Sequence, residues 1–500
     1  MGIAMTSDNS IPREPRIAYL QPGQTVPKDA RDALHSFNVS TTALALLGSL
    51  RDAGYGDLHF FDVACEQGDV LTELNEALFY KGAPDADVAA WLQGVAPDVV
   101  CVTSMFTCDT PAVDRLCTLV GQAVPDALLL VGGRHASLMP HWHMENAAVD
   151  FLVQGEGEEI LVHLLDALSG RSDKDPGAME GVFTRQTIDA RSPKAWPEAR
   201  LGGTFAFDLV LFKPDGSFRY KELVIADSPK DHLYKRKAVA LRSAPLLPTR
   251  GCPLACRFCG SHFTPEMRPV GADKLMADIE LCYDKGVRIF YNISENFCLG
   301  QEDRRFVAKL ADFRDKVGGD LLLTHPNSTF LPVYMKGKVP DVEFIEQLQR
   351  AGTSLVTISI ETFNARFDDK SLFRRYTKEQ VEALFRHLQS VGMNVHLYMM
   401  TGFPTETEDE LLGDVRRIKE WLEGGLIDAA SWSNLLYLPG TPYYKEAIAL
   451  GRFTEAEFRQ WIYQGFYFFA APERLNFSAV PTPRLREVLG HLRVGDYSFV

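Results

Sequence analysis

The chain has 500 residues, of which 46% are hydrophobic and 24% charged, and its 52 Lys and Arg against 66 Asp and Glu give a formal net charge of -14. This composition is typical of a globular protein of about three domains, and it excludes collagen, coiled coil and disorder as descriptions of the whole chain. Because the overall charge is acidic, we expect no nucleic acid and no membrane among the partners.

Residues 1–14 are polar and are expected to form a disordered lead-in. They lack the apolar segment of a secretory signal, and no apolar run in the chain reaches the roughly 18 residues that a spanning helix needs. Nine cysteines are too few for a disulfide framework in a chain of this length. We therefore expect a cytoplasmic protein with reduced thiols.

Between residues 15 and 170, short β-rich runs alternate with amphipathic helical runs. The predicted strands are 16–20, 58–62, 99–103, 128–131 and 150–153, and the predicted helices are 41–53, 87–93, 111–120, 140–147 and 158–168. This alternation is typical of an α/β domain with a parallel, doubly wound sheet in flavodoxin-like (Rossmann-like) order. Ligands bind such sheets beyond the carboxyl ends of the strands.

Residues 171–239 interrupt this alternation and are expected to connect two domains. The runs 205–212 and 218–225 flank Lys213-Pro214-Asp215-Gly216, a sequence that favours a tight turn. Two apolar runs around such a turn predict a β-hairpin within the connector.

From residue 240 to residue 445 the alternation resumes. The predicted strands are 244–248, 288–292, 320–324, 354–360, 394–400 and 430–436, and the predicted helices are 272–285, 303–316, 341–351, 378–391 and 406–423. Eight such repeats would close a full barrel, so six predict a partial (β/α)6 TIM-like barrel with its chemistry at the carboxyl ends of the strands. Residues 446–500 are expected to form a small C-terminal capping region. Its aromatic run, 463–469, would cap the barrel or line a substrate pocket.

Three cysteines follow the first barrel strand with the spacing C-x3-C-x2-C, namely Cys252, Cys256 and Cys259. Three thiolates so close in one loop can face a common point. A four-iron cluster normally takes four cysteines, so three would leave one iron open to another ligand. Zinc is the main alternative, and His262 is available as its fourth ligand.

This motif, with Phe258 before its last cysteine, resembles the signature of the radical S-adenosylmethionine (SAM) superfamily. In that family the signature also follows the first strand of a six-repeat partial barrel. The resemblance implies one 4Fe-4S cluster held by Cys252, Cys256 and Cys259, with SAM bound to the open iron and cleaved to a 5′-deoxyadenosyl radical. It also implies an electron donor such as flavodoxin or ferredoxin.

Further blocks that resemble the family lie at the ends of later barrel strands. They are Ser294-Glu295-Asn296-Phe297, Glu361-Thr362, Gly402-Phe403-Pro404-Thr405-Glu406-Thr407 and Tyr437-Leu438-Pro439-Gly440-Thr441-Pro442. The resemblance implies that SAM is bound by Phe258, Ser294, Glu295, Asn296, Glu361, Gly402, Pro404, Leu438 and Pro439. Each block alone is also explained by a turn between a strand and a helix.

Glycine-rich and polar blocks end three strands of the first domain: Val102-Thr103-Ser104-Met105, Val131-Gly132-Gly133-Arg134-His135-Ala136 and Gln154-Gly155-Glu156-Gly157. Together with the barrel they resemble the cobalamin-binding domain of class B radical SAM methyltransferases. The resemblance implies cobalamin contacts from Thr103, Ser104, Met105, Gly132, Gly133, His135, Gly155, Glu156 and Gly157. Since the chain lacks the Asp-x-His-x-x-Gly motif, we expect base-off cobalamin without a His ligand.

The resemblance implies a cobalamin-dependent radical SAM methyltransferase that uses methylcobalamin and a 5′-deoxyadenosyl radical. Its substrate would be an unactivated carbon, or a phosphinate phosphorus, of a small-molecule natural-product intermediate, since the blocks also resemble those of phosphonate and phosphinate methyltransferases. Three alternatives stay open. They are a B12-binding radical SAM enzyme that performs a rearrangement or oxidative cyclisation, a methylthiotransferase, and a cobalamin-binding sensor with a structural cluster.

The methylthiotransferase alternative requires a second cluster on N-terminal cysteines. The candidates are Cys65, Cys101, Cys108 and Cys117. Because Cys101 lies within a predicted strand and Cys117 within a predicted helix, core packing is the favoured interpretation.

Overall fold

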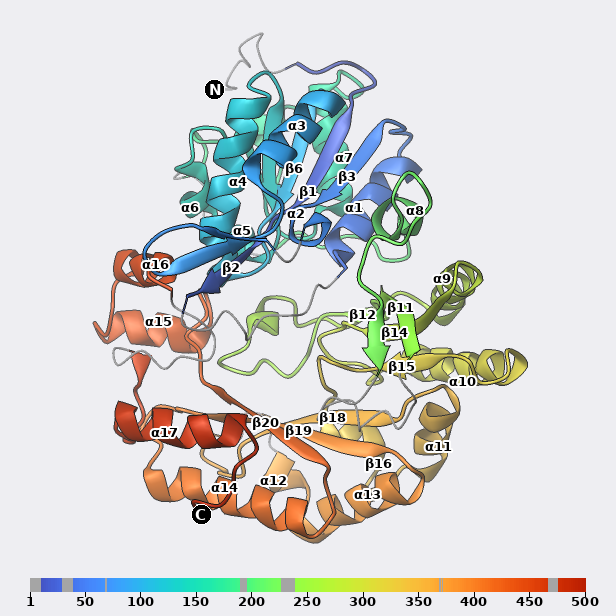
Figure 1. The fold of residues 1–500 in the computed structure, drawn as a ribbon, viewed down its shortest axis with the longest axis vertical. Coiled ribbons are helices and arrows are strands. Elements are labelled where there is room, and N and C mark those ends of the chain that lie inside the picture. Colours follow the sequence, from blue (N-terminus) through green and yellow to red (C-terminus); the bar gives the residue numbers. More distant parts are fainter. Residues whose placement is uncertain are drawn as a thin grey trace. The chain divides into compact units, whose positions relative to one another are not determined.

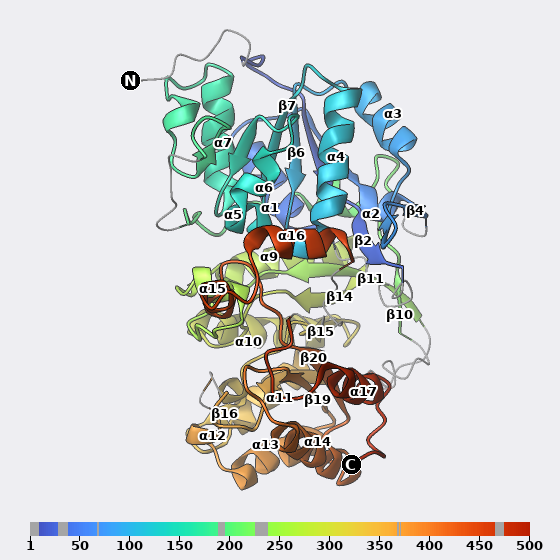
Figure 2. The same cartoon turned by 90° about the vertical axis from the view of Figure 1, so that its left-hand side faces the viewer.

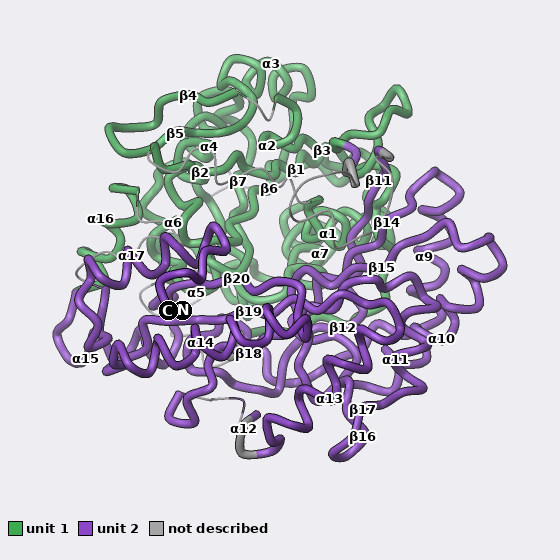
Figure 3. Tube along the Cα trace, turned by 60° about the horizontal axis from the view of Figure 1, so that its bottom comes forward, with its two compact units in different colours: residues 1–221, 454–467 green, residues 222–453, 468–500 purple. Residues whose placement is uncertain are grey.

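The structure is a computed structural model of the chain, and it describes residues 10–28, 39–67, 70–188, 196–225, 239–367, 370, 372–465 and 475–500. The chain divides into two compact units, Met1–Lys221 with Thr454–Tyr467 and Glu222–Phe453 with Phe468–Val500 (Figure 3). Within the described ranges, no helix is both long enough and apolar enough to cross a membrane.

Unit 1 is built on a six-stranded sheet in the order β3-β1-β6-β7-β8-β9. Its strands are β1 (Ile17–Gln21), β3 (Leu58–Asp62), β6 (Val99–Thr103), β7 (Leu128–Gly132), β8 (Phe151–Val153) and β9 (Val182–Phe183). The first five strands are parallel, and β9 pairs antiparallel with β8 at the edge. In chain order the parallel strands run 2-1-3-4-5, so the predicted flavodoxin-like order is confirmed.

Helices cover both faces of this sheet. The helix α1 (Thr41–Asp52) packs against α7 (Gly157–Leu168), and α3 (Asp85–Val95) packs against α4 (Thr110–Ala123) on the other side (Figure 2). A parallel sheet that is covered by helices on both faces needs strands whose side chains are apolar on both faces. The strand β1 shows this requirement, since its first four residues are all buried.

Smaller elements complete unit 1. They are the antiparallel sheet of β2 (Gln24–Pro27), β5 (Leu78–Lys81) and β4 (Leu71–Glu73), and the short helices α2 (Val63–Glu66), α5 (Arg134–Leu138), α6 (Pro140–Met144) and α8 (Phe207–Leu211). The helix α16 (Glu455–Tyr463) also belongs to unit 1 and contacts α4. This differs from the expectation that residues 446–500 as a whole cap the barrel.

The predicted hairpin of the connector is wrong for its first arm, which forms α8. Phe207, Val210 and Leu211 are buried, and their spacing of three and four residues is that of one helix face. Of the hairpin, only one antiparallel bridge between Phe212 and Phe218 remains. The strand β10 (Leu223–Ile225) pairs with β11 of unit 2.

Unit 2 contains six parallel strands that form a partial barrel. They are β11 (Val239–Leu246), β14 (Val287–Asn292), β15 (Leu322–Thr324), β18 (Leu355–Glu361), β19 (Asn394–Thr401) and β20 (Ala429–Asn434). The groups β11-β14-β15 and β18-β19-β20 are joined by a parallel bridge between Thr329 and Ile358. The predicted (β/α)6 TIM-like architecture is therefore confirmed.

Helices follow the barrel strands along the chain and lie outside them (Figure 1). They are α9 (Ala272–Asp284), α10 (Gln301–Lys316), α11 (Val342–Arg350), α12 (Leu372–Arg375), α13 (Lys378–Ser390) and α14 (Glu408–Glu423). The start of α14 is fixed by a capping box of Thr407 and Glu410. The remaining elements are β12 (Thr249–Arg250), β13 (Arg268–Pro269), β16 (Met335–Lys336), β17 (Val339–Pro340), α15 (Pro442–Ala449) and α17 (Thr482–Arg493).

Candidate cofactor sites

The cysteine loop begins directly after β12, at the carboxyl end of the first barrel strand. Gly251 has φ 86°, and a Cβ atom on it would lie 1.9 Å from the carbonyl oxygen of Glu266, so only glycine fits there. The amide of Cys252 donates to the carbonyl of Thr264 at 2.9 Å, and β12 pairs with β13. The chain's own backbone therefore fixes where the cysteines start.

The three thiols of this loop lie in a shielded environment. Cys252 and Cys256 are buried, and Cys259 is half-buried. Burial raises the pKa of the Cys252 thiol, and the nearby Cys259 raises it further. Three thiols on one loop are the donor set of an iron–sulfur cluster. Among the described residues, no three His, Cys, Asp or Glu side chains are close enough together to hold a metal ion. The role of the three cysteines as metal ligands therefore stays a prediction. The zinc alternative stays open too, because the side chain of His262 lies outside the described residues.

The block after β14 fastens the cysteine loop to the barrel. Ser294 accepts a hydrogen bond from the amide of Thr249 at 3.0 Å, and the Glu295 carboxylate accepts one from the amide of Gly251 at 3.2 Å. The side-chain amide nitrogen of Asn296 lies 3.9 Å from the sulfur of Cys252. These residues therefore hold the loop in place, and their predicted contacts with SAM stay predictions.

Buried polar atoms without a partner gather at the carboxyl ends of the barrel strands. Within the described part of the chain, three side-chain atoms make no hydrogen bond: Nδ2 of Asn292 at the end of β14, Oδ1 of Asn434 at the end of β20, and the hydroxyl of Tyr437. Most buried polar atoms are paired, so each of these needs an explanation. A cofactor rich in amino, carboxylate and hydroxyl groups, such as SAM, fits this end of the barrel.

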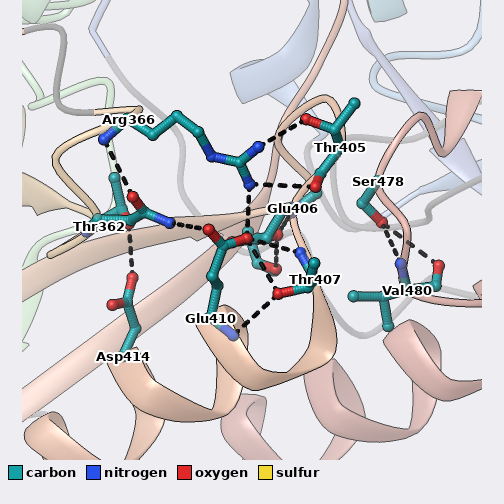
Figure 4. A network of polar contacts seen from close by, with 12 residues as sticks. Thr362, Arg366, Thr405, Glu406, Thr407, Glu410, Asp414, Ser478 and Val480 are labelled. Atoms are coloured by element: carbon teal, nitrogen blue, oxygen red, sulfur yellow. Dashed lines mark hydrogen bonds and ion pairs between the residues drawn. The ribbon is translucent and has the colours of Figure 1, made fainter.

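Two buried carboxylates shape the loops after β18 and β19, and neither was singled out from the sequence (Figure 4). Glu406 accepts hydrogen bonds from the hydroxyl of Thr401 at 2.8 Å and the amide of Gly402 at 2.6 Å. Asp414 accepts one from the hydroxyl of Thr362 at 2.6 Å. Burial raises the pKa of Glu406 to about 7 and that of Asp414 to about 6.

The hydrogen bonds of these carboxylates position two predicted SAM-binding blocks. Gly402 and Pro404 lie in the turn between β19 and α14 that Glu406 closes. On the outer side of this turn, Arg366 pairs with Glu410 at 2.6 Å and donates to the hydroxyl of Thr405 at 3.1 Å (Figure 4). The turn is thus tied to the loop that follows β18.

The last predicted SAM block lies between β20 and α15, next to the cysteine loop. Thr441 caps α15 and donates from its hydroxyl to the carbonyl of Leu438 at 2.7 Å, which fixes the turn that contains Pro439. The guanidinium of Arg257, the neighbour of Phe258, stacks 4.5 Å from the ring centre of Tyr443. The turn and the cysteine loop are therefore in contact.

The inner face of the second half of the barrel is polar. Along β19 the side chains of Val395, Leu397 and Met399 are fully buried, whereas His396 and Tyr398 on the opposite face are half-buried. A ring nitrogen of His396 lies 2.9 Å from the hydroxyl of Ser431, and the Tyr398 hydroxyl donates to the carbonyl of Pro326 at 2.9 Å. This face offers hydrogen-bonding groups rather than a purely apolar wall.

Glu361 ends β18 in an unusual conformation and has a partner that was not predicted. Its φ is 69°, and the pairing register with β19 shifts between Ser359 and Glu361. The ammonium group of Lys370 lies 2.7 Å from the Glu361 carboxylate. Lys370 was not predicted from the sequence, because it lies in none of the blocks that resemble the family.

In unit 1, the predicted cobalamin residues that follow β6 and β7 form one connected corner. The amide of Ser104 donates to the carbonyl of Gly132 at 2.7 Å, and the amide of His135 donates to the carbonyl of Ser104 at 3.0 Å. Gly133 has φ 108°, and a Cβ atom on it would lie 2.6 Å from the Ser104 carbonyl oxygen. The corner therefore depends on a glycine at position 133.

Buried hydroxyls at this corner are left without a hydrogen bond of normal geometry. Among the residues that the structure describes, they belong to Thr103, the last residue of β6, and to Ser104. Such hydroxyls are costly unless a ligand satisfies them. They lie at the carboxyl edge of the sheet, where ligands of this fold bind, so the corner fits a polar part of cobalamin.

The side chain of His135 is buried beside this corner. One ring nitrogen lies 3.0 Å from the hydroxyl of Thr107, and its ring packs edge-on against Trp142 and His143. Burial lowers its pKa well below the usual value, so the ring is neutral. Its other ring nitrogen, Nε2, has no hydrogen-bond partner among the described residues, so the predicted contact of His135 with cobalamin stays a prediction.

Of the other predicted cobalamin residues, the block before α7 contacts the chain itself. The Glu156 carboxylate accepts a hydrogen bond from the amide of Ala199 at 2.7 Å, and the amide of Gly155 donates to the Ser137 hydroxyl at 2.9 Å. Gly157 is the first residue of α7. Met105 accepts a hydrogen bond from the Thr42 hydroxyl at 3.7 Å. Contacts of these four residues with cobalamin stay predictions.

Comparison with known proteins identifies both domains. The B12 binding domain matches residues 40–165, and the Radical SAM superfamily matches residues 246–418. The chain is 26% identical over 411 residues to the anaerobic magnesium-protoporphyrin IX monomethyl ester cyclase of Cereibacter sphaeroides, an alignment that covers 80% of this chain but only 59% of the cyclase. It is 22% identical over 396 residues to the cytidylyl-2-hydroxyethylphosphonate methyltransferase of Streptomyces wedmorensis, covering 74% of this chain and 70% of that protein.

A solved structure shares the fold of most of the chain. TsrM from Kitasatospora setae, a radical S-adenosylmethionine methyltransferase with cobalamin and a 4Fe-4S cluster bound, matches with a TM-score of 0.61 at 19% identity, covering 87% of this chain and 75% of TsrM. The chain thus consists of a B12-binding domain followed by a radical SAM domain, as the motifs implied. Among radical SAM proteins it is of the cobalamin-dependent kind, and its two domains imply cobalamin, SAM and a 4Fe-4S cluster as cofactors.

Proposed function

We propose that this protein is a methyltransferase that uses cobalamin and radical SAM chemistry on a small-molecule natural-product intermediate. The observation that carries the proposal is the loop of Cys252, Cys256 and Cys259 at the carboxyl end of the first barrel strand, in a chain that also has a B12-binding domain. When bound, SAM and the cluster supply a radical that removes a hydrogen atom, and cobalamin supplies the methyl group.

The chain's own residues then have three tasks. The three cysteines hold the cluster, and Ser294, Glu295 and Asn296 keep their loop aligned through the bonds described above. The SAM-binding set would be the nine residues predicted from the motifs, from Phe258 to Pro439. The corner of Thr103, Ser104, Gly132 and Gly133 would hold cobalamin, within a domain of residues 15–170 that precedes a barrel of residues 240–445.

The polar inner face of β19 and β20 supports a substrate with hydrogen-bonding groups. His396, Tyr398 and Ser431 are half-buried there. The similarity to a methyltransferase named for a cytidylyl-phosphonate fits such a substrate. The methyl acceptor would be an unactivated carbon or a phosphinate phosphorus, and an electron donor such as flavodoxin or ferredoxin would reduce the cluster.

A second candidate function is favoured by the 26% identity to a protein named as a cyclase. In this alternative the same two cofactor domains perform an oxidative cyclisation or a rearrangement without methyl transfer. The two candidates differ in one product. Only the methyltransferase leaves a methyl group from SAM on the substrate.

Cofactor stoichiometry is the first test. The protein is purified without oxygen, reconstituted with iron, sulfide and hydroxocobalamin, desalted and analysed. We expect about four irons and one corrin per chain, the amounts for one cluster and one cobalamin. Iron without corrin would overturn the role of cobalamin, and protein without iron would overturn the whole proposal.

Product analysis then separates the two candidates. The reconstituted protein is incubated with a reductant, methyl-labelled SAM and a panel of phosphonate-containing acceptors. Label in an acceptor together with 5′-deoxyadenosine supports methyl transfer. Acceptor consumed without label supports the cyclisation or rearrangement alternative instead.

A further inference from the structure

The carboxyl end of β18 carries local strain at a charged residue. Glu361 has φ 69°, a conformation that residues with a side chain rarely adopt. The register with β19 shifts just before it, as in a β-bulge. Strained backbone of this kind persists only where surrounding contacts hold it, and it is concentrated at functional sites.

The contact that holds Glu361 is a buried ion pair. The Lys370 ammonium nitrogen lies 2.7 Å from a carboxylate oxygen of Glu361 and 3.3 Å from the carbonyl oxygen of Ser359. The side chains of Lys370 and Glu361 are only 9% and 14% exposed. Because removing two charges from water is costly, such a pair is weak support for stability as such and calls for another role.

The surroundings of Lys370 supply that role. Burial by itself lowers the pKa of Lys370, but the Glu361 carboxylate and the thiols of Cys256 and Cys259 raise it more, so the group stays charged. The cysteine loop follows β11 and β12, and Lys370 follows β18, so both lie at the carboxyl ends of barrel strands, and the sulfur atoms of Cys256 and Cys259 act electrostatically on the ammonium group. Charges act strongly on one another in such a shielded place.

We propose that Lys370 is a positioning residue that fixes Glu361 at the SAM end of the barrel and places a positive charge beside the iron–sulfur cluster. The inference rests on the proposed function, because it assumes that the cysteines hold a cluster and that SAM binds next to it. It adds a residue that lies outside every motif. In this arrangement the Lys370 and Glu361 charges act on the cluster with opposite signs.

The consequence for the cluster is a matter of charge. Reduction adds one negative charge to the cluster, and a nearby positive charge favours the reduced form. Lys370 therefore raises the reduction potential, and Glu361 lowers it. Loss of Lys370 also frees the Glu361 carboxylate, so SAM loses an aligned partner.

The test is a double-mutant cycle of Lys370→Met, Glu361→Gln and the double variant in the reconstituted holoprotein. Cluster potentials are measured by redox titration followed by electron paramagnetic resonance. We expect Lys370→Met to shift the potential to more negative values, Glu361→Gln to shift it to less negative values, and the double variant to return close to wild type. The matched control is Lys309→Met on α10, which removes an exposed ion pair with Asp273 of α9 and should leave the potential unchanged.

SAM binding gives a second readout. The change that SAM causes in the resonance spectrum of the reduced cluster is titrated, and Lys370→Met should weaken the apparent affinity at least tenfold, whereas Lys370→Arg should restore most of it. If Lys370→Met loses the cluster, Lys370→Gln and Glu361→Gln still test the opposite signs. Potentials that move in the same direction, or not at all while only the melting temperature falls, would overturn the inference.

Failure of the proposed function looks different. If the wild-type protein binds no cluster, or if SAM leaves its spectrum unchanged, the radical SAM assignment itself fails. If the wild-type protein responds to SAM but the variants show no opposed shifts, only the role of Lys370 fails.

Discussion

The cysteine loop of unit 2 and the glycine-rich strand ends of unit 1 were both identified by short motifs, but the structure treats them differently. In unit 2 the motif residues bond to one another: Ser294 and Glu295 accept from the amides of Thr249 and Gly251. In unit 1 the motif residues are also joined, by backbone hydrogen bonds from Ser104 to Gly132 and from His135 to Ser104, but their side chains lie in different surroundings. Ser104 faces the sheet edge with an unpartnered hydroxyl, while His135 turns into the core.

The difference follows from what each residue type can do. Only a cysteine supplies a thiolate to bind a metal, so three closely spaced cysteines indicate a site directly. A glycine or a histidine can also be needed for a backbone turn or for packing. A motif made of these residues can therefore indicate the fold instead of a binding site. The motifs of unit 1 therefore contain two kinds of residue: those with polar groups free to bind a ligand, and those that stabilise the domain.

The strongest test of this comparison replaces the cysteines one at a time by alanine. Each of Cys252→Ala, Cys256→Ala and Cys259→Ala should abolish the cluster and the formation of 5′-deoxyadenosine, because two thiolates do not hold a cubane with an open iron. Iron analysis and product chromatography measure both losses. Cys282→Ala, which removes a buried thiol on α9, is the control and should keep the iron; a cysteine variant with full iron would contradict the assignment.

The second test asks whether the unpartnered hydroxyls of unit 1 bind cobalamin. Ser104→Ala removes a buried hydroxyl that has no partner among the described residues, so the protein without corrin should become more stable by about 1 kcal/mol. The same variant should bind hydroxocobalamin about tenfold more weakly, the effect of losing roughly one hydrogen bond. Thermal unfolding and corrin titration measure the two changes.

The matched variant for Ser104 is Thr107→Val, whose hydroxyl is already used by His135 at 3.0 Å. It should lower the stability of the protein without corrin instead of raising it. Equal effects of the two variants on stability would show that the hydroxyl of Ser104 has a partner in the protein.

The third test concerns His135 itself. His135→Leu removes the bond to Thr107 and leaves that hydroxyl buried, so the free energy of unfolding should fall by about 1–2 kcal/mol. The absorption spectrum of bound corrin should stay the same, because the ring packs against Trp142 and His143 in the core. A changed corrin spectrum would support the predicted contact of His135 with cobalamin.

The same histidine makes stability depend on pH. Its folded-state pKa is far below the unfolded value near 6.5. Below about pH 6.5 the unfolded chain binds a proton that the folded protein does not, so the wild type loses stability as the pH falls. His135→Leu should lose less stability than wild type between pH 7 and pH 5.

Much of the fold could be predicted from the sequence because its parallel strands are apolar and alternate regularly with amphipathic helices. The strand Leu58–Asp62 and the strand Val99–Thr103 have the predicted ends. The antiparallel sheet of β2, β5 and β4 was missed, since its three- and four-residue strands are too short to show a period. The helix α8 was mistaken for a strand because a five-residue apolar run does not distinguish the two.

The candidate site was predictable only where chemistry or a motif fixes the residue type. Lys370 approaches Cys256 and Cys259 only because the barrel brings the ends of its first and fourth strands together. Glu406 lies within one of the blocks that resemble the family. The residue type alone does not show that its side chain is buried and accepts a hydrogen bond from the amide of Gly402. Contacts that depend on closure of the fold leave no local signal in the sequence.

The smallest expected effect concerns this turn, and it tests whether a buried carboxylate holds a loop of unit 2. Glu406 has a folded-state pKa of about 7, raised by burial from an ordinary value of 4.5. Between these values the folded protein binds the proton more tightly than the unfolded chain does. Stability contributed by Glu406 is therefore complete below about pH 4.5 and is lost as the pH rises through 7.

Glu406→Gln keeps an oxygen that can accept from Thr401 and Gly402 but carries no charge at any pH. Relative to wild type, this variant should be more stable at pH 8 than at pH 5, by about 1 kcal/mol or more. Chemical unfolding at the two pH values measures the difference. The matched variant Glu408→Gln, on the first turn of α14 and partly exposed, should show no comparable trend. An equal trend in both variants would mean that burial of Glu406 is not the cause, and that the turn is held by its backbone alone.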